Sequence, residues 1–451
     1  MNEPEEILDA DHEQLIERVA AIDVAKESGK VCVRRPDPAR PGRRISRVWD
    51  VAATTNAVLL LACQLLELGV QKITVESTSD YWRIWFYLLE SQGLDVQLVN
   101  ARDVKNVPGR PKTDKLDAVW LAKLTEKGLL RPSFVPPTPI RALRDYTRMR
   151  IDFTREATRH WQRLEKLLED ALIKISSVAC KLDTLSTRDM IEALIRGERD
   201  PHVLAELARG RMRSKRAALL QALTGQFDDH HAELARMLLD QIDALNDQIN
   251  TLTTRIEAVI AAIPAARAAD SDRDDPDGTD TGHATSRAQL AAIDRLDEIP
   301  GISRLTAQVI LAEVGLDMTK FPTANHLAAW AKLTPRTIQS GAKHRAGKTG
   351  KGNPYLKGVL GEAATAAAKT NTFLGERYRR IVKRRGKLKA LVAVARSILI
   401  IVWHLLADPT ARFHELGADY HMTRINKGRK IRHLVQQLEA LGHTVTLQPA
   451  A

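Results

Sequence analysis

Between Arg18 and Val135 the hydrophobic pattern alternates between that of strands and that of helices. The segments VAAIDVA, KVCVRR and RISRVWDVA predict three strands, the first two joined by a Ser28-Gly29 turn. TNAVLLLACQLLELG then shows helical periodicity ending at Gly69, KITVEST predicts a strand, YWRIWFYLLESQG a helix closed by Gly93, and DVQLVN another strand. A final helix is predicted to start in KTDKLDA.

This order of three strands, helix, strand, helix, strand and helix is that of a ribonuclease-H-like α/β domain. The chain beyond it changes character. Residues 138–263 contain little Pro or Gly, and stretches such as WQRLEKLLEDALIKI space apolar residues among charges, which predicts long amphipathic helices and a coiled-coil arm. Residues 264–288 are rich in Asp, Gly and Thr with almost nothing to bury, which predicts a flexible acidic linker.

We therefore expect an α/β plus all-α protein. Its predicted parts are an N-terminal extension (1–17), a ribonuclease-H-like domain (18–135), a helical coiled-coil region (136–263), the acidic linker (264–288), a mostly helical C-terminal domain (289–410) and a basic C-terminal tail (411–451). With 451 residues in all, the chain is long enough for several buried cores.

The charge of the chain points to an acidic polymer as its partner. The formal net charge is +12, and residues 332–389 alone hold sixteen Lys or Arg against two acids, a local charge of +14. The densest stretch is ERYRRIVKRRGKLK, whose cations would line a helix. A solvated helix face is the alternative, but so one-sided a balance favours contact with phosphates, through Arg379, Arg380, Lys383, Arg384 and Arg385.

The cellular setting is predicted from three other features. The three cysteines fit neither a disulfide framework nor a zinc site, which indicates a reduced cytosolic environment. The acidic start MNEPEEILDADHEQL lacks the features of a secretory leader. The longest apolar run, Leu391 to Ala407, is interrupted by Arg396 and His404 and predicts a buried core helix, not a membrane span.

Four acidic residues stand out in the sequence, either because they lie in or at the end of an apolar strand or because they lie close together on one helix. Asp23 lies inside an apolar strand and needs a cation nearby, and Glu76 stands at the end of another such strand. Asp114 and Asp117, three residues apart, share one face of the last helix. In a ribonuclease-H-like order the first strand, the fourth strand and the last helix converge at one sheet edge, so the four acids would meet there.

Such a group of oxygen ligands suits hard divalent cations, and two Mg²⁺ ions about 3.5 to 4 Å apart can stabilise both the attacking and the leaving oxygen of a phosphodiester. Phosphoryl transfer is the implied reaction class. Each acid also has a plain structural reading: Glu76 as a surface acid at a strand end, and Asp114 as a helix cap or first-turn acid. The four together favour a metal site.

A second constellation lies in the C-terminal half. IPGISRLTAQVILAEVG predicts helix, I-P-G-I hairpin and helix, a motif that can hold a phosphate, although a plain helical hairpin with Gly301 in its turn fits equally well. Ser340-Gly341 then opens a glycine-rich loop able to follow a phosphate backbone with Lys343, Arg345, Lys348 and Lys351. A loop serine is ordinarily a turn or capping residue, and nothing in the spacing singles out Ser340.

Together the motifs resemble a known family. AIDVAK, VEST, KTDKLDA, IPGI, LTPRTIQSG and GKGNPYL, in this order from about Ala20 to Ala407, resemble the DEDD insertion-sequence transposases, which join a RuvC-like domain to a C-terminal transposase domain and include the bridge-RNA-guided recombinases and the pilin-inversion recombinase. The resemblance implies that Asp23, Glu76, Asp114 and Asp117 bind Mg²⁺ and that Ser340 is the nucleophile forming a phosphoserine link to DNA.

The resemblance also implies donor and target DNA, a structured guide RNA and a homo-oligomeric (dimeric or tetrameric) assembly as partners, in a cytoplasmic, nucleoid-associated protein. The acids of one subunit would face the serine of another. After Ser340 this chain reads AGKTGKGN where many members have Ile-Ser-Lys, which separates Lys348 and Thr349 from the common pattern. Two other functions stay open: a RuvC-type junction-resolving nuclease using metal-activated water, and a catalytically silent nucleic-acid scaffold.

Overall fold

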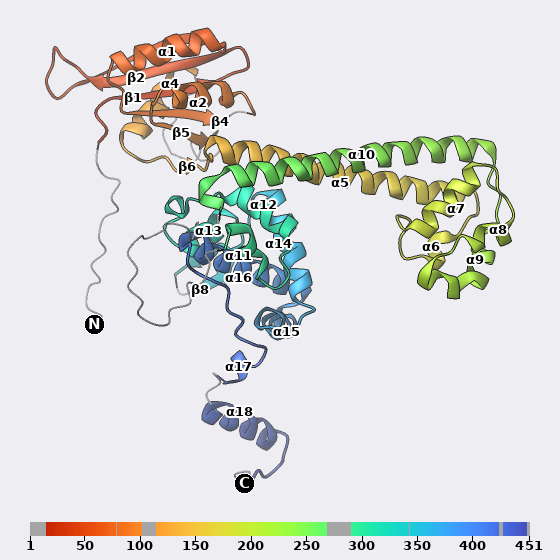
Figure 1. Ribbon diagram of the computed structural model, residues 1–451. Helices are drawn as coiled ribbons and strands as arrows, with labels where there is room; N and C mark the ends of the chain where they lie inside the picture. The colour runs from red at the N-terminus through yellow and green to blue at the C-terminus, as the bar shows by residue number, and fades with distance from the viewer. Residues whose placement is uncertain are drawn as a thin grey trace, which may run out of the picture. The chain divides into compact units, whose positions relative to one another are not determined.

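The computed structural model describes residues 15–77, 79–101, 114–267, 290–341, 343–423 and 427–448. The chain divides into two compact units, residues 1–135 and 136–451 (Figure 1). Residues 1–14 of the predicted N-terminal extension and 268–288 of the predicted acidic linker lie outside the described residues, as do Lys112 and Thr113 of the KTDKLDA motif.

The first unit is built on a six-stranded mixed sheet in the order β3-β2-β1-β4-β5-β6. β1 pairs in parallel with β4 and β4 with β5, whereas β1–β2, β2–β3 and β5–β6 are antiparallel. Its elements are β1 (Val19–Val24), β2 (Ser28–Pro36), β3 (Arg44–Ala52), α1 (Thr55–Glu67), β4 (Lys72–Ser77), α2 (Trp82–Ser91), β5 (Val96–Asn100), α4 (Asp114–Glu126) and β6 (Pro132–Ser133).

This order agrees with the α/β prediction, with two differences: no hydrophobic pattern predicted the two-residue strand β6, and Ser28 and Gly29 begin β2 where a turn was predicted. β1 is central, and Val19 to Ile22 are fully buried because both faces of the sheet are covered. Ala20 and Ile22 pack with α1 and α2 on one face, in a core that also includes Trp85. Val19 and Ala21 pack on the other face with α4.

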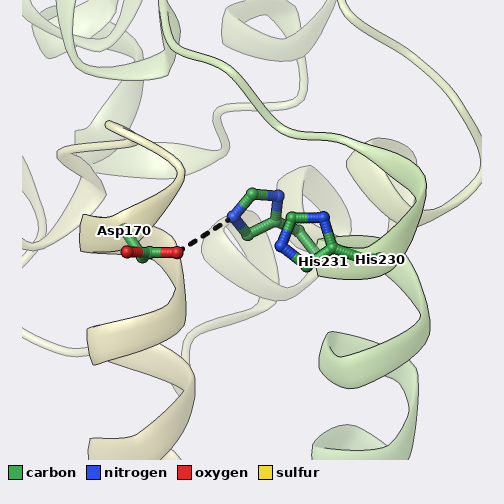
Figure 2. A group of neighbouring side chains, drawn as sticks. All are labelled: Asp170, His230 and His231. Carbon is green, nitrogen blue, oxygen red and sulfur yellow. Dashed lines mark hydrogen bonds and ion pairs between the residues drawn. The ribbon is translucent and has the colours of Figure 1, made fainter.

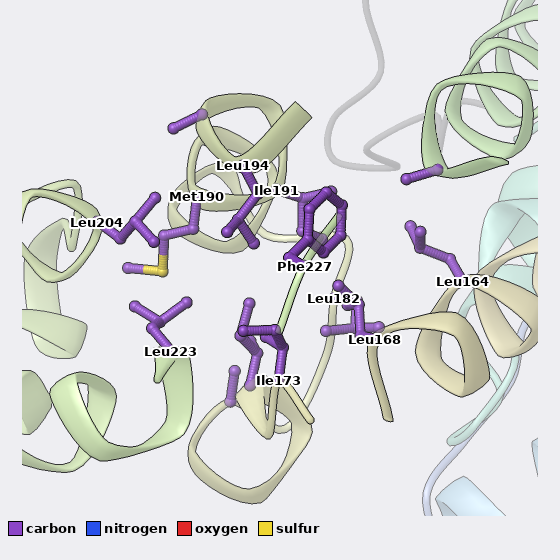
Figure 3. Packing of buried hydrophobic residues seen from close by; sticks show 14 of the residues in the cluster. Leu164, Leu168, Ile173, Leu182, Met190, Ile191, Leu194, Leu204, Leu223 and Phe227 are labelled. Carbon is purple, nitrogen blue, oxygen red and sulfur yellow. The ribbon is translucent and has the colours of Figure 1, made fainter. Parts of the chain in front are cut away.

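The second unit begins with two long helices, α5 (Thr138–Asp170) and α10 (Asp229–Ala262), which pack along each other. We call this pair with the helices between them the arm (Figure 1). The intervening segment forms the tip of the arm: α6 (Ile175–Val178), α7 (Leu185–Ile195), α8 (Pro201–Glu206), the 3-10 helix η1 (Gly210–Lys215) and α9 (Arg216–Leu223). Its core includes Met190, Leu194, Leu223 and Phe227 (Figure 3).

The C-terminal part of the unit is mostly helical. It contains η2 (Pro264–Ala266), α11 (Ala292–Asp297), α12 (Arg304–Val314), η3 (Met318–Lys320), α13 (Ala324–Trp330), the hairpin β7 (Thr337–Ser340) and β8 (Lys343–Ala346), α14 (Pro354–Ala367), α15 (Phe373–Arg385) and α16 (Lys387–Ala407). The segment predicted as a basic tail contains α17 (Tyr420–Thr423) and α18 (Lys427–Ala440).

Among the described residues one helix, α16, is long and apolar enough to cross a membrane by length and composition. It packs against α11, α13, α14 and α15, and Val394, Ile398, Leu399 and Val402 are fully buried in that contact. This packing is that of the core helix of the C-terminal part.

Candidate active site

The sheet register brings Asp23 and Glu76 side by side. Ile22 of β1 is paired with Val75 of β4, so the next residues on these parallel strands are Asp23 and Glu76. Side chains two apart on a strand share a face, which places Asp23 with Ala21 and Glu76 with Thr74, on the face covered by α4. Glu76 is only 5% exposed. The cross-strand neighbour of Asp23 on β2 is the cation Lys30.

Helix α4 runs antiparallel to these strands. Its C-terminal end lies at the start of β1, because the backbone N–H of Ile16 donates to the carbonyl of Glu126 at 3.0 Å. The hydroxyl of Thr125 donates to Thr74 Oγ1 at 2.7 Å and sets the register of the helix on β4. The start of α4, with Asp114 as its first residue and Asp117 one turn later, therefore lies toward the strand ends that carry Asp23 and Glu76.

Two neighbouring strands thus carry acids at one end of the sheet, and α4 begins toward the same end. The predicted ligands are all carboxylates, and Glu76 is nearly buried. Carboxylate oxygens are the ligand type that Mg²⁺ or Mn²⁺ prefers. The donor set therefore fits the predicted divalent cation.

Two polar residues that hold α4 in place were not predicted from the sequence. Glu126 is 4% exposed and accepts a hydrogen bond from Arg34 of β2, while Arg44 Nε of β3 lies 2.9 Å from Glu126 Oε1. Thr125 supplies the contact to β4. The available signal was an acid in the last turn of a helix, where the helix dipole disfavours it unless cations are near.

Ser340 lies at the end of a strand, not in the glycine-rich loop predicted for it. It is the last residue of β7 and is paired with Lys343 of β8, and Gly341 follows with φ +57°. Cross-strand pairing places Ile338 opposite Arg345. The glycine-rich segment is confined to the return from β8 to α14, where the structure has neither helix nor strand from Gly347 to Asn353.

The I-P-G-I turn packs against a neighbouring helix. Gly301 has φ +92°, and a Cβ there would lie 2.3 Å from the carbonyl oxygen of Ala363 in α14. Ser303 caps α12 by accepting from the N–H of Thr306 at 3.4 Å. Close helix packing by itself accounts for the glycine, and phosphate binding by this turn stays a prediction.

The predicted phosphate-binding cations are mostly exposed. Arg380, Lys383, Arg384 and Arg385 follow one another along α15, and Arg345, Lys348 and Lys351 are exposed on and beyond β8. Arg379 differs, because its guanidinium donates to Glu376 at 2.9 Å and to the carbonyl of Thr370. Burial together with the nearby cations Arg380 and Arg396 lowers the pKa of Arg377, so positive charge concentrates around this helix.

A group of possible metal ligands lies far along the chain from the four acids, at the tip of the arm. Asp170 closes α5, and His230 and His231 begin α10, with ligand atoms within 4.8 Å of one another (Figure 2). His231 Nδ1 accepts the backbone N–H of Asp228 at 3.1 Å, which leaves the proton of the neutral ring on Nε2, facing Asp170 Oδ2 at 3.4 Å. His231 therefore serves as a helix cap and a partner of Asp170.

Comparisons with known proteins match one family model in each half of the chain. Residues 20–173 match the family model DEDD_Tnp_IS110, described as a transposase, and residues 293–379 match the model of the transposase IS116/IS110/IS902 family. The first match contains the four acids and the second contains Ser340.

Two curated relatives are similar to parts of the chain. An uncharacterised 43.6 kDa protein of insertion element IS110 from Streptomyces coelicolor is 31% identical over 193 residues, covering 39% of this chain and 44% of the relative. The transposase for insertion sequence element IS1111A from Coxiella burnetii is 34% identical over 117 residues, covering 25% of this chain and 32% of the relative. The chain thus spans less than half the length of each relative. Because two models of this family match residues 20–173 and 293–379, the chain belongs to the IS110 family of transposases.

Proposed function

We propose that this protein is a DNA transposase or recombinase of an insertion sequence, which cuts and rejoins DNA by transesterification. The observation that carries the proposal is the side-by-side placement of Asp23 and Glu76 on β1 and β4, with the start of α4 directed toward the same end of the sheet, in a chain that also carries the Ser340 hairpin. The family membership supports DNA as the substrate, both as donor and as target.

In the proposed reaction Asp23, Glu76, Asp114 and Asp117 hold Mg²⁺, in a two-metal arrangement. Bound there, the ions supply stabilisation for the charge that develops on the phosphate oxygens. Ser340 forms a bond from its Oγ to phosphorus, the bond from phosphorus to one deoxyribose oxygen breaks, and the serine proton passes to that oxygen through a base. Rejoining reverses these steps with a new deoxyribose hydroxyl.

The phosphate backbone is held, in this proposal, by the cations of the return segment and of α15. Lys343, Arg345, Lys348 and Lys351 lie on or shortly after the hairpin that carries Ser340. Arg380, Lys383, Arg384 and Arg385 extend the positive surface along α15. We propose further that a structured guide RNA selects the DNA, and that two or more copies assemble so that the acids of one face Ser340 of another.

The test is the formation of a covalent protein–DNA link. The purified protein, with its copurifying RNA and Mg²⁺, is incubated with labelled donor DNA and then denatured. Wild type should yield DNA-linked protein, Ser340→Ala should yield none, and Asp23→Asn and Asp117→Asn should lose strand cleavage. Asp95→Asn is the matched acid control, because Asp95 is exposed and pairs with Lys72 at the start of β4, the opposite end of the strand that carries Glu76. Ser214→Ala, on the tip of the arm, is the serine control.

Two results would overturn the serine chemistry: an equal yield of linked DNA from Ser340→Ala, or Mg²⁺-dependent release of free nicked strands from both wild type and Ser340→Ala. The second result is that expected of a RuvC-type nuclease in which water attacks. Sequencing the copurifying RNA tests the guide: a single structured species adjoining the element's own gene is expected, and a random mixture of cellular RNA would contradict it.

A further inference from the structure

A buried carboxylate connects the arm to the segment that returns from Ser340. Glu313, on α12, is 0% exposed. Arg148 of α5 donates to both of its oxygens, from Nε to Oε1 at 2.7 Å and from Nη2 to Oε2 at 2.8 Å. Arg144, one turn earlier on α5, donates to the backbone carbonyls of Ala312 and Glu313 at 3.1 and 2.8 Å. A buried charge is tolerated only when paired in this way.

A further donor to the Glu313 carboxylate comes from the residue before α14. Asn353 Nδ2 donates to Glu313 Oε2 at 2.5 Å, while Asn353 Oδ1 accepts the N–H groups of Tyr355 and Leu356 at 3.0 and 3.2 Å and so caps α14. One amide therefore performs two tasks, which can be separated by substitution: the oxygen caps the helix, and the nitrogen binds the carboxylate.

The neighbouring turn of α14 is also attached to α5. The hydroxyl of Tyr355 donates to Asp152 Oδ2 at 2.8 Å. The guanidinium groups of Arg148 and Arg155 lie over the Tyr355 ring, 4.9 and 5.4 Å from its centroid. Such cation–π contacts add to the attachment because Arg148 is already oriented by Glu313.

The segment between β8 and α14 is fixed at both ends. At its start the N–H of Gly347 donates to the carbonyl of Arg336, immediately before β7, at 2.6 Å. Further along, Lys357 Nζ donates to the carbonyl of Gly350 at 2.9 Å, and Asn353 ends the segment at Glu313. The base of the Ser340 hairpin is therefore tied through this segment to Glu313 and to α5.

We infer that Glu313 and Asn353 are positioning residues for the Ser340 hairpin, with α5 of the arm as the rigid element against which they hold it. This inference rests on the proposed role of Ser340. Neither residue needs to touch DNA: Glu313 orients Asn353, and Asn353 fixes the return segment from the hairpin. Without DNA, the pair holds the hairpin in place. It affects the reaction only by fixing the position of Ser340.

Three variants at one position separate positioning from capping. Asn353→Ser keeps an oxygen suited to capping but has no amide to reach Glu313, Asn353→Asp keeps the cap but sets two carboxylates against each other, and Asn353→Ala removes both functions. We expect hydrogen exchange of the amides in residues 337–346 to be about tenfold faster in all three, as for the loss of a hydrogen bond to a charged group. The rate of DNA linkage should fall by a similar factor, with DNA affinity unchanged.

Exchanging the two side chains provides a rescue. The double variant Glu313→Gln, Asn353→Asp again places one amide and one carboxylate at the contact, and the amide oxygen at position 313 can still accept from Arg148 Nε. It should recover slow exchange and a large part of the linkage rate lost in Asn353→Asp. Arg159→Ala is the matched control on α5, because Arg159 is exposed and pairs with Glu156 at 3.3 Å, and it should leave both quantities unchanged.

Wild-type exchange and linkage in Asn353→Ser would show that the asparagine is only a cap and would overturn the inference, as would a double variant no better than Asn353→Asp. The exchange measurement does not depend on the chemistry. If wild type formed no DNA link, the proposed role of Ser340 would fail while the exchange data still decided whether Glu313 and Asn353 hold the hairpin.

Discussion

The hydroxyl of Thr125 donates to the hydroxyl oxygen of Thr74 at 2.7 Å, inside the contact between α4 and β4. Thr74 also accepts from Gln97 Nε2 at 2.7 Å, and the Thr125 hydroxyl is shared with the carbonyl of Leu121 in its own helix. Both threonines are at most 1% exposed. This small polar contact fixes how far α4 extends along the sheet, and thereby where Asp117 lies relative to Glu76.

Replacing Thr125 by valine should loosen this register while preserving shape. We expect a loss of about 1 kcal/mol in the free energy of opening of the α4–β4 contact, the usual net value of one buried hydrogen bond. Native-state hydrogen exchange of amides in both elements measures it. Thr251→Val is the control, since that exposed hydroxyl donates to the carbonyl of Asp247 in its own helix. A change confined to α4, with β4 unaffected, would contradict the shared role.

Two glycines in the C-terminal part of the chain should respond in opposite directions to alanine. Gly301→Ala forces a Cβ to within 2.3 Å of Ala363 O at φ +92°, so we expect destabilisation of about 2 kcal/mol or more. Gly361 lies within α14 with nothing near its Cβ position, so Gly361→Ala should stabilise by about 0.5 to 1 kcal/mol. Thermal unfolding measures both, and equal shifts would refute the packing argument.

The three cysteines should differ in reactivity. Cys32 is fully buried, and burial raises the pKa of its thiol to about 11 against the opposing effect of Arg34, whereas Cys63 and Cys180 are exposed. Alkylation of the folded protein near pH 8 should therefore label Cys63 and Cys180 and spare Cys32 until unfolding. Peptide mapping after labelling decides this, and early labelling of Cys32 would count against the fold of the first sheet.

The same thiol gives a pH dependence. Because the folded-state pKa of Cys32 is raised, its contribution to stability is complete below the unfolded pKa of about 9 and is lost as the pH rises toward 11. The unfolding free energy of wild type should therefore fall over this range more than that of Cys32→Ala. Identical alkaline curves for the two proteins would show that the thiol does not contribute.

The cations of α15 should set the salt dependence of DNA binding. Arg384 is exposed with no partner among the described residues, so Arg384→Gln should reduce the slope of log affinity against log salt by about 0.9. Arg255→Gln, an exposed cation on α10, is the control and should leave the slope unchanged. Titrations at several salt concentrations measure this, and equal slopes in all three proteins would remove α15 from the DNA surface.

Local patterns were sufficient to predict the elements of the first unit other than β6, and the strand positions of Asp23 and Glu76. These patterns involve residues that are close together in the sequence: an acid inside an apolar strand, or two acids three residues apart at the start of a helix. The contacts that position α4 on the sheet were not predictable. Thr74 and Thr125, like Arg34 and Glu126, are far apart in the sequence, and no local pattern pairs them.

The second unit shows the same division. Long amphipathic helices were predicted from residues 138–263, but not the folded tip between α5 and α10, whose short helices have a core of their own. The hairpin at Ser340 was missed because its strands are only four residues each and lie amid glycine and lysine. The role of Glu313 could not be predicted, because it depends on contacts with Arg144, Arg148 and Asn353, which are distant in the sequence.

The length of α5 means that a small change in its tilt moves the tip of the arm by a larger distance. α5 has 33 residues and is therefore about 50 Å long. Its contacts with Glu313, through Arg144 and Arg148, lie in the first third of the helix. A tilt of α5 by about 5° at Arg144 and Arg148 would displace its distant end, at Asp170, by about 3 Å. A displacement of the tip would therefore act on the contact between α5 and Glu313, the same carboxylate that binds Asn353.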